Sequence, residues 1–290
     1  MGWRTAGCGR PHRRGMRTLA LLLVVAACCP APRPARAADG LRLRYRFAPG
    51  ERIVMDVAHR ALTETTIGAA RQSVETATDS TKIWTVVAVD AEGHATIEHS
   101  VGDVTMTSRT SDKGESRWSS REGVPAPPDY EAVALSLGVP LSRLVVDATG
   151  RVLERRDFKP TPPAGTGDLM VVPLPDEPAT AGTEWTVPQE VVVEVPGGPR
   201  KAVKTRLRYR VAEIRDGVAA IDVDTTVLTP LDDPRLEARL LERIWDGRLE
   251  FDVARGRLVS RSTGIDRRVV GFSGPESSVR YKASLEEKIQ

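Results

Sequence analysis

The fold of this chain is decided by residues 205–224, which read TRLRYRVAEIRDGVAAIDVD. Arginine occupies every second position at Arg206, Arg208 and Arg210, with apolar residues between them. Side chains alternate between the two faces of a β-strand, so the arginines share one face at a spacing of about 6.8 Å. Because Gly217 follows in a tight-turn sequence, the segment predicts a β-hairpin.

The two strands of this hairpin carry opposite charges on one face. A turn centred on residues 215–217 places Arg210 opposite Asp222 and Arg208 opposite Asp224. Cross-strand pairs of opposite charge contribute roughly 0.2–1 kcal/mol each, and they define the register of a face that lacks apolar side chains. The other face then gathers the apolar side chains Leu207, Val211, Ile221 and Val223.

The same strand–turn–strand pattern occurs earlier in the chain. An Asp-to-Gly turn follows each hairpin, at Asp147–Gly150 and again at Asp252–Gly256. The order of the signals is the same both times, so we predict two related β units. Five positions recur at a constant offset of 124, where Thr81, Ile83, Val87, Gly93 and Ile97 match Thr205, Leu207, Val211, Gly217 and Ile221.

One glycine marks a change in the apolar pattern. The apolar face of residues 95–101 shifts past Gly102 to Val104 and Met106. Such a phase change indicates a β-bulge. Together these signals predict an all-β fold with one or two short helices, built as an antiparallel curved sheet, half-barrel or sandwich.

The chain divides at residues 159–183, a segment rich in proline, glycine and threonine. Two segments suit short helices: residues 129–137, with Asp129 as the cap, and residues 234–245. The predicted organisation is a signal peptide and tether at 1–38, a first β unit at 39–158, a connection at 159–183 and a second β unit at 184–290.

The first 38 residues have the layout of a bacterial-type secretory signal peptide. A positive stretch around Arg13 and Arg14 precedes the apolar run 19–27, and a small-x-small cleavage signal ends at Ala37. Cleavage then follows Ala37 or Ala38, and Met1 and Met16 are alternative starts. The apolar run is too short to span a bilayer.

A second processing site competes with ordinary cleavage. Val25-Ala26-Ala27-Cys28 resembles a lipobox, the signal for lipoprotein processing at a cysteine. Lipidation at Cys28 would leave residues 29–39 as a tether. The prediction is therefore an exported protein, periplasmic or extracellular, whose contact with a membrane is confined to this lipid anchor.

Charge and cysteine usage exclude several classes of function. Seven of the 42 basic residues lie in residues 1–37, so the remaining chain holds 35 basic residues against 39 acidic ones. Its composition supports no basic patch for nucleic acid. All three cysteines, Cys8, Cys28 and Cys29, lie in the leader, which excludes a disulfide framework or a thiolate site in the folded part.

Catalytic and metal-binding motifs are absent from the sequence. The segment 271–275, Gly-Phe-Ser-Gly-Pro, departs from Gly-x-Ser-x-Gly at its last position. His94 and His99 lie at a spacing that puts them on opposite faces of a strand, which does not suit zinc. We expect His99 on the apolar face opposite Thr85, as a satisfied structural residue. We predict no catalytic residue, no metal ligand and no cofactor.

One stretch carries a family resemblance. Residues 173–185, PLPDEPATAGTEW, together with the strand and glycine of residues 45–50, resemble an uncharacterised family of exported bacterial β-rich proteins, a domain of unknown function. By analogy, the long hairpins are similar to the half-barrel of lipoprotein carriers, which hold acyl chains in an apolar concavity. This resemblance implies a fold and transfers no catalytic residue.

Three functions remain as alternatives. The first is a non-enzymatic exported envelope protein that binds a lipid or another apolar small molecule. The second is a structural or interaction module with an envelope protein as its partner. The third is a hydrolase whose carboxylates come together only in the folded chain.

Overall fold

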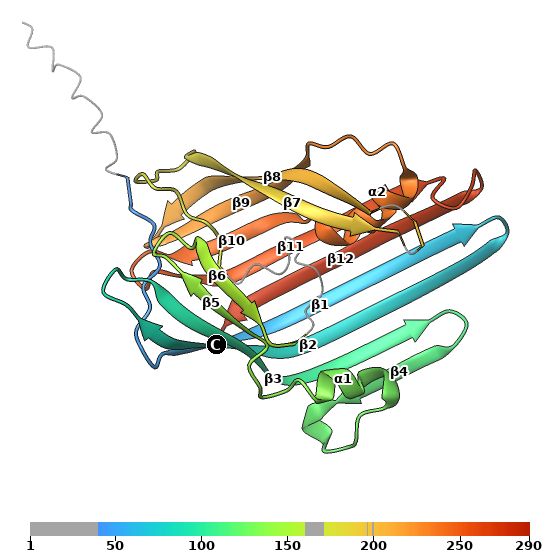
Figure 1. Cartoon of the computed structure of the whole chain (residues 1–290), viewed down its shortest axis with the longest axis horizontal. Coiled ribbons are helices and arrows are strands. Elements are labelled where there is room, and N and C mark those ends of the chain that lie inside the picture. Colours follow the sequence, from blue (N-terminus) through green and yellow to red (C-terminus); the bar gives the residue numbers. More distant parts are fainter. Residues whose placement is uncertain (1–39, 160–170, 196, 199) are drawn as a thin grey trace, which may run out of the picture. The chain divides into compact units, whose positions relative to one another are not determined.

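The computed structural model describes residues 40–159, 171–195, 197–198 and 200–290. Residues 38–290 belong to one compact unit. Its main element is a single curved sheet of twelve strands, and all named strand pairs are antiparallel (Figure 1). The predicted fold class is therefore confirmed.

The strands follow the chain in order, with two short helices between them. They are β1 (Arg52–Ile67), β2 (Ala70–Val89), β3 (Ala95–Thr110), β4 (Gly114–Ser119), β5 (Ser142–Val146), β6 (Val152–Asp157), β7 (Glu184–Glu194), β8 (Arg200–Arg215), β9 (Val218–Val227), β10 (Asp246–Asp252), β11 (Arg257–Val270) and β12 (Ser277–Ile289). The helices are α1 (Glu131–Ala134) and α2 (Pro234–Leu240).

The sheet consists of two meanders with the same strand order. The order across the sheet is β6-β5-β3-β2-β1-β12-β11-β10-β9-β8-β7, with β4 paired to β3. The set β1-β2-β3-β5-β6 and the set β7-β8-β9-β10-β11 each pair in chain order, and both sets run in the same direction across the sheet. Strand β12 joins the two sets by pairing with both β1 and β11 (Figure 1). The duplication of the sequence itself, with its predicted domain boundaries, stays a prediction.

The register predicted for the second hairpin is confirmed. Arg210 lies opposite Asp222 and Arg208 lies opposite Asp224. The Arg208–Asp224 ion pair forms at 2.9 Å. Asp222 instead accepts from Arg248 of β10, at 2.8 Å, because a third strand adds a competing cation that the hairpin alone does not reveal.

The bulge predicted at Gly102 is also present, because Ser80 pairs with Val104 while Lys82 pairs with Val101. A second bulge occurs at the same place in both hairpins, at Val86/Ala88 and Val211/Glu213, and the longer first turn shifts their comparison by one residue. Val86 pairs with Ile97 as Val211 pairs with Ile221. The counterpart of Val211 is thus Val86, which is fully buried, whereas Val87 is 46% exposed.

The sheet has one covered face, which we call the inner face. We define it by the cross-strand row Val57, Glu287, Arg261, Leu249, Ile221 and Val211, which runs from β1 to β8. The inner faces of β3 and β5 meet those of β8 and β9 in one core. The two halves of the sheet thus contribute to one shared core.

Two extended segments fill this core between the ends of the sheet. Leu43 and Tyr45 come from the segment before β1, and Val171 and Val172 come from the segment before β7. The Tyr45 hydroxyl donates to the Val172 carbonyl at 3.2 Å and accepts from the Val172 N–H at 2.9 Å. These contacts tie the two segments together.

The helix predictions need one correction. Residues 129–137 form only a 3-10 turn and the single turn of α1, and Asp129 caps neither. Pro127 and Pro128 restrict the start of this segment, and its anchor is the stacking of Tyr130 on Trp118, with ring centroids 6.2 Å apart. In the 234–245 segment, α2 forms as expected, and Asp233 caps it by accepting from the Arg235 N–H at 2.9 Å.

We expect Gly150→Ala to destabilise the fold through this core. An added Cβ would lie 2.5 Å from the Val172 carbonyl oxygen and 2.6 Å from the Tyr45 ring. Gly217→Ala is the matched control, because Gly217 has nearly the same positive φ, +78° against +79°, but open space around it. Urea unfolding should show Gly150→Ala less stable than Gly217→Ala by about 1–3 kcal/mol. Equal stabilities would contradict this packing.

Candidate binding site

Three charged side chains meet on the inner face where β12 joins the two halves of the sheet. Glu287 of β12 accepts from Lys82 of β2 through Oε1 and from Arg261 of β11 through Oε2. The Arg261 Nε donates at 2.6 Å, and its Nη2 donates to the same oxygen. The charged cluster, Lys82, Arg261 and Glu287, thus spans four adjacent strands.

The charged cluster is removed from water. Glu287 and Arg261 are 4% and 3% exposed, and Glu287 is the only acid buried among the residues described. Burial alone would raise the pKa of Glu287, but the two cations outweigh it and hold that pKa at about 2. The carboxylate therefore stays ionised at neutral pH, and the described cluster carries two positive charges against one negative charge.

Two polar atoms beside Lys82 lack a hydrogen-bond partner. Trp84 is the next inward residue of β2, and its Nε1 is buried and unpaired. His99 lies opposite Trp84 on β3, and its Nε2 is also buried and unpaired. Burying a polar atom without a partner costs roughly 1–3 kcal/mol. The Thr263 Oγ1, on the same face of β11, is buried and unpaired as well, but Trp84 and His99 are the two such residues that lie next to Lys82.

The histidine differs from its prediction in two ways. His99 does lie on the inner face, but it pairs with Trp84 and not with Thr85, because a bulge at Val87 of β2 shifts the register. Its unpaired Nε2 means that it is not satisfied. Burial, with a contribution from the nearby Lys82 charge, lowers the pKa of His99 to about 4, so the ring is neutral near pH 7.

An apolar band lies on the inner face next to the charged cluster. Trp245 follows α2 and packs against Ala283 and Leu285 of β12 and Val57 of β1. The His59 ring lies 5.8 Å from the Trp245 ring.

A hollow of about 480 Å³ lies farther along the inner face. Thr76 and Thr78 of β2, Met106 and Ser108 of β3, and Tyr130 are among its lining residues. Met106 and Tyr130 also belong to a small apolar cluster with Val104 and Trp118. Lys113, Glu115 and Asp129 also line the hollow, which therefore combines hydroxyl, methyl and thioether groups with three charged side chains.

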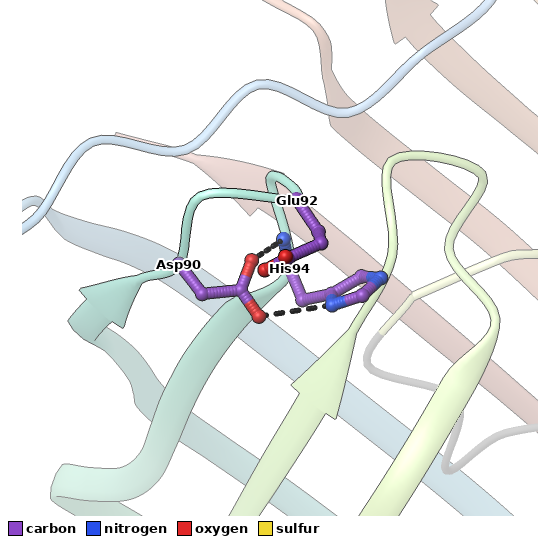
Figure 2. A group of neighbouring side chains, drawn as sticks. All are labelled: Asp90, Glu92 and His94. Carbon is purple, nitrogen blue, oxygen red and sulfur yellow. Dashed lines mark hydrogen bonds and ion pairs between the residues drawn. The ribbon is translucent and has the colours of Figure 1, made fainter.

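A separate group of metal-ligand type lies in the turn before β3. Asp90, Glu92 and His94 place their ligand atoms within 4.8 Å of one another (Figure 2). Asp90 accepts from the His94 backbone N–H at 2.8 Å and lies 2.9 Å from its Nδ1. The backbone hydrogen bond is the main cause that lowers the pKa of Asp90. The two acids are exposed, and their contacts with His94 account for the arrangement.

Several predicted features lie outside the described residues. They are the lipidation site Cys28 and the cleavage sites Ala37 and Ala38. Within the part of the chain that the structure describes, no helix is long and apolar enough to cross a membrane. The prediction that the protein has no catalytic residue, metal ligand or cofactor stays a prediction.

Sequence reasoning missed the charged cluster, although one signal was present. Glu287 follows Ala283 and Leu285 at two-residue spacing and precedes Ile289, so a charge interrupts an apolar face. The alternation in β12 could have marked this glutamate as buried. Its partners come from distant strands, and no local pattern identifies them.

Comparisons with known proteins give only remote likenesses. The sequence matches no family model and no curated protein. A structure described as lipid–protein interactions in lipovitellin aligns with 84% of this chain at 10% identity and a TM-score of 0.42, and this chain spans about a quarter of that one, 25%. DynF from the dynemicin biosynthesis pathway of Micromonospora chersina aligns with 89% of this chain and 92% of its own, at 8% identity and a TM-score of 0.20. Both TM-scores are too low to place this chain in either fold.

We expect Glu287→Gln to destabilise the protein strongly. The substitution leaves the buried cations of Lys82 and Arg261 without a carboxylate, and breaking a buried pair in this way costs about 3–5 kcal/mol. Glu286→Gln is the matched control on the exposed face of the same strand, with an expected effect within about 0.5 kcal/mol. Urea unfolding measures both, and equal effects would contradict the burial of the charged cluster.

His99 should make the stability depend on pH in mildly acidic solution. Its pKa of about 4 in the folded protein lies below the ordinary 6.5. As the pH falls from 6.5 towards 4, the unfolded chain binds a proton that the folded chain excludes, so stability decreases. Between pH 7 and pH 5 the loss should be roughly 1–2 kcal/mol.

His99→Gln should remove most of this loss, whereas His94→Gln, at the exposed turn, should leave it unchanged. Urea midpoints at the two pH values measure the effect. A His99→Gln protein with the wild-type pH dependence would show that another group is responsible.

Proposed function

We propose that this protein is a non-enzymatic, exported envelope protein that binds an apolar ligand on the inner face of its sheet. The hollow lined by Thr76, Thr78, Met106, Ser108 and Tyr130 is the observation that carries the proposal. Its volume falls within the range of small-molecule sites, about 300–1,000 Å³. The leader predicted at residues 1–38 supports export.

The surroundings of the hollow suit a ligand with a long apolar part. The hollow shares Met106 and Tyr130 with the apolar cluster that includes Val104 and Trp118. The apolar band of Trp245, Ala283, Leu285 and Val57 lies on the inner face of β1 and β12. Threonine side chains offer methyl groups to a ligand and hydroxyls to water. The inner face can therefore hold an apolar chain without exposing a large apolar surface when empty.

The hydrolase alternative receives less support from the acids of the inner face. General acid–base catalysis needs a carboxyl group with a pKa near the working pH. Glu287 is held ionised by Lys82 and Arg261, with its pKa at about 2. Such a carboxylate suits an ion pair and does not suit proton transfer.

The interaction-module alternative rests on the edge strand β6. All six of its side chains are exposed, including Val152 at 45% and Leu153 at 52%. An exposed edge can pair with a strand of another protein. Glu154, Arg155, Arg156 and Asp157 put charges on the same short strand, which is typical of edges that avoid pairing. We therefore rank the alternative second.

The neutral dye Nile red tests ligand binding directly. We expect its fluorescence to rise on the wild-type protein and Ser108→Trp to weaken its binding roughly tenfold, because the new ring fills the hollow. Arg109→Trp is the matched control: Arg109 lies on the opposite face, with its side chain 63% exposed. A wild-type protein that does not bind the dye, or two variants that bind it equally, would contradict the proposal.

A further inference from the structure

The charged cluster has more positive than negative charge, and this imbalance needs a physical explanation. Lys82 and Arg261 share the single carboxylate of Glu287, whose two oxygens are each already in use. Buried charges are normally paired, because an uncompensated ion loses its hydration without replacement. The described residues supply no second buried acid. The inner face is therefore electrostatically incomplete on its own.

The same place has a buried donor without an acceptor. The Trp84 Nε1 can only donate, and it is buried with no acceptor. The neighbouring His99 Nε2 is buried and unpaired as well. Trp84, His99 and Lys82 occupy adjacent inward positions of β2 and β3, so the missing acceptor and the missing negative charge fall in one place.

We propose that the anionic group of an amphiphilic ligand, a carboxylate on an apolar chain, binds beside Lys82, Trp84 and His99. One carboxylate supplies the negative charge that the cluster lacks and an acceptor oxygen for the Trp84 Nε1, and its second oxygen can accept from His99 in the tautomer that carries its proton on Nε2. This inference rests on the proposed function, since it names the polar end of the apolar ligand.

The position of the hollow relative to this site fits such a ligand. Thr76, Thr78, Ser80 and Lys82 are successive inward residues of β2, and the first two line the hollow. At the rise of a β-strand, four residues separate Thr78 from Lys82 by about 13 Å, which a chain of twelve carbons can span. A single extended chain with its carboxylate at Lys82 would therefore have its apolar end in the hollow.

Displacement of Nile red by two matched ligands tests the proposal. Dodecanoate and dodecanol have the same chain and differ in the anionic group. We expect dodecanoate to displace the dye from the wild-type protein at a roughly tenfold lower concentration than dodecanol. Lys82→Met should remove this preference. The variant should fold, because Met replaces the lysine stem and Arg261 and Glu287 remain as a one-to-one pair.

Two controls make the result specific. Lys288→Met removes a lysine from the exposed face of β12, next to Glu287, and should keep the preference. Trp84→Phe keeps an aromatic ring but removes its N–H, and it should reduce the preference without abolishing it. Equal displacement by the two ligands on the wild-type protein, or a preference that survives Lys82→Met, would overturn the anionic site while the proposed function stands. Failure of the wild-type protein to bind Nile red would overturn the proposed function itself.

Discussion

The pairing of β12 with both β1 and β11 is the constraint on which the rest of the structure depends. Among the described strands, β12 is the one that pairs with both meanders. The charged cluster reinforces the join, because Glu287 of β12 binds Lys82 on one side and Arg261 on the other. A slip of β12 by one residue would turn Ala283 and Leu285 to the outer face together with Glu287, and in one direction it would place Lys288 against the two cations. The apolar and ionic contacts of this face together therefore specify the register of the strand that unites the sheet.

The parts of the fold that the sequence predicts are those encoded by neighbouring residues. The alternation of arginine and apolar residues before Gly217, and of aspartate and apolar residues after it, defines a hairpin whose register needs no third strand. Gly102 reveals a bulge because the apolar pattern changes phase there. The helix at 129–137 shows the limit of such signals. A cap residue and an apolar run suggest several turns, but the packing of Tyr130 on Trp118 leaves room for one.

The candidate site could not be predicted in the same way, because its residues come from separate parts of the chain. Lys82 and Glu287 lie 205 residues apart and meet only when β1 and β12 pair. Trp84 reads as an ordinary core residue in the sequence, and its unpaired nitrogen becomes visible only when every neighbour is in place. His99 illustrates the error that follows from a missed bulge, since a one-residue shift changes its partner from Thr85 to Trp84.

The pairing of β1 with β12 also has a consequence for the route by which the chain folds. Gln290 donates to Asp56 across a separation of 234 residues, so the central contacts of the sheet close a very large loop. Closing a loop costs entropy before its contacts form, and folds rich in distant contacts reach the native state slowly. Each meander has local hairpins that can form early. Until β12 joins them, the strand edges of β1 and β11 that β12 later covers stay unpaired. During that time a strand of a neighbouring chain can pair with them.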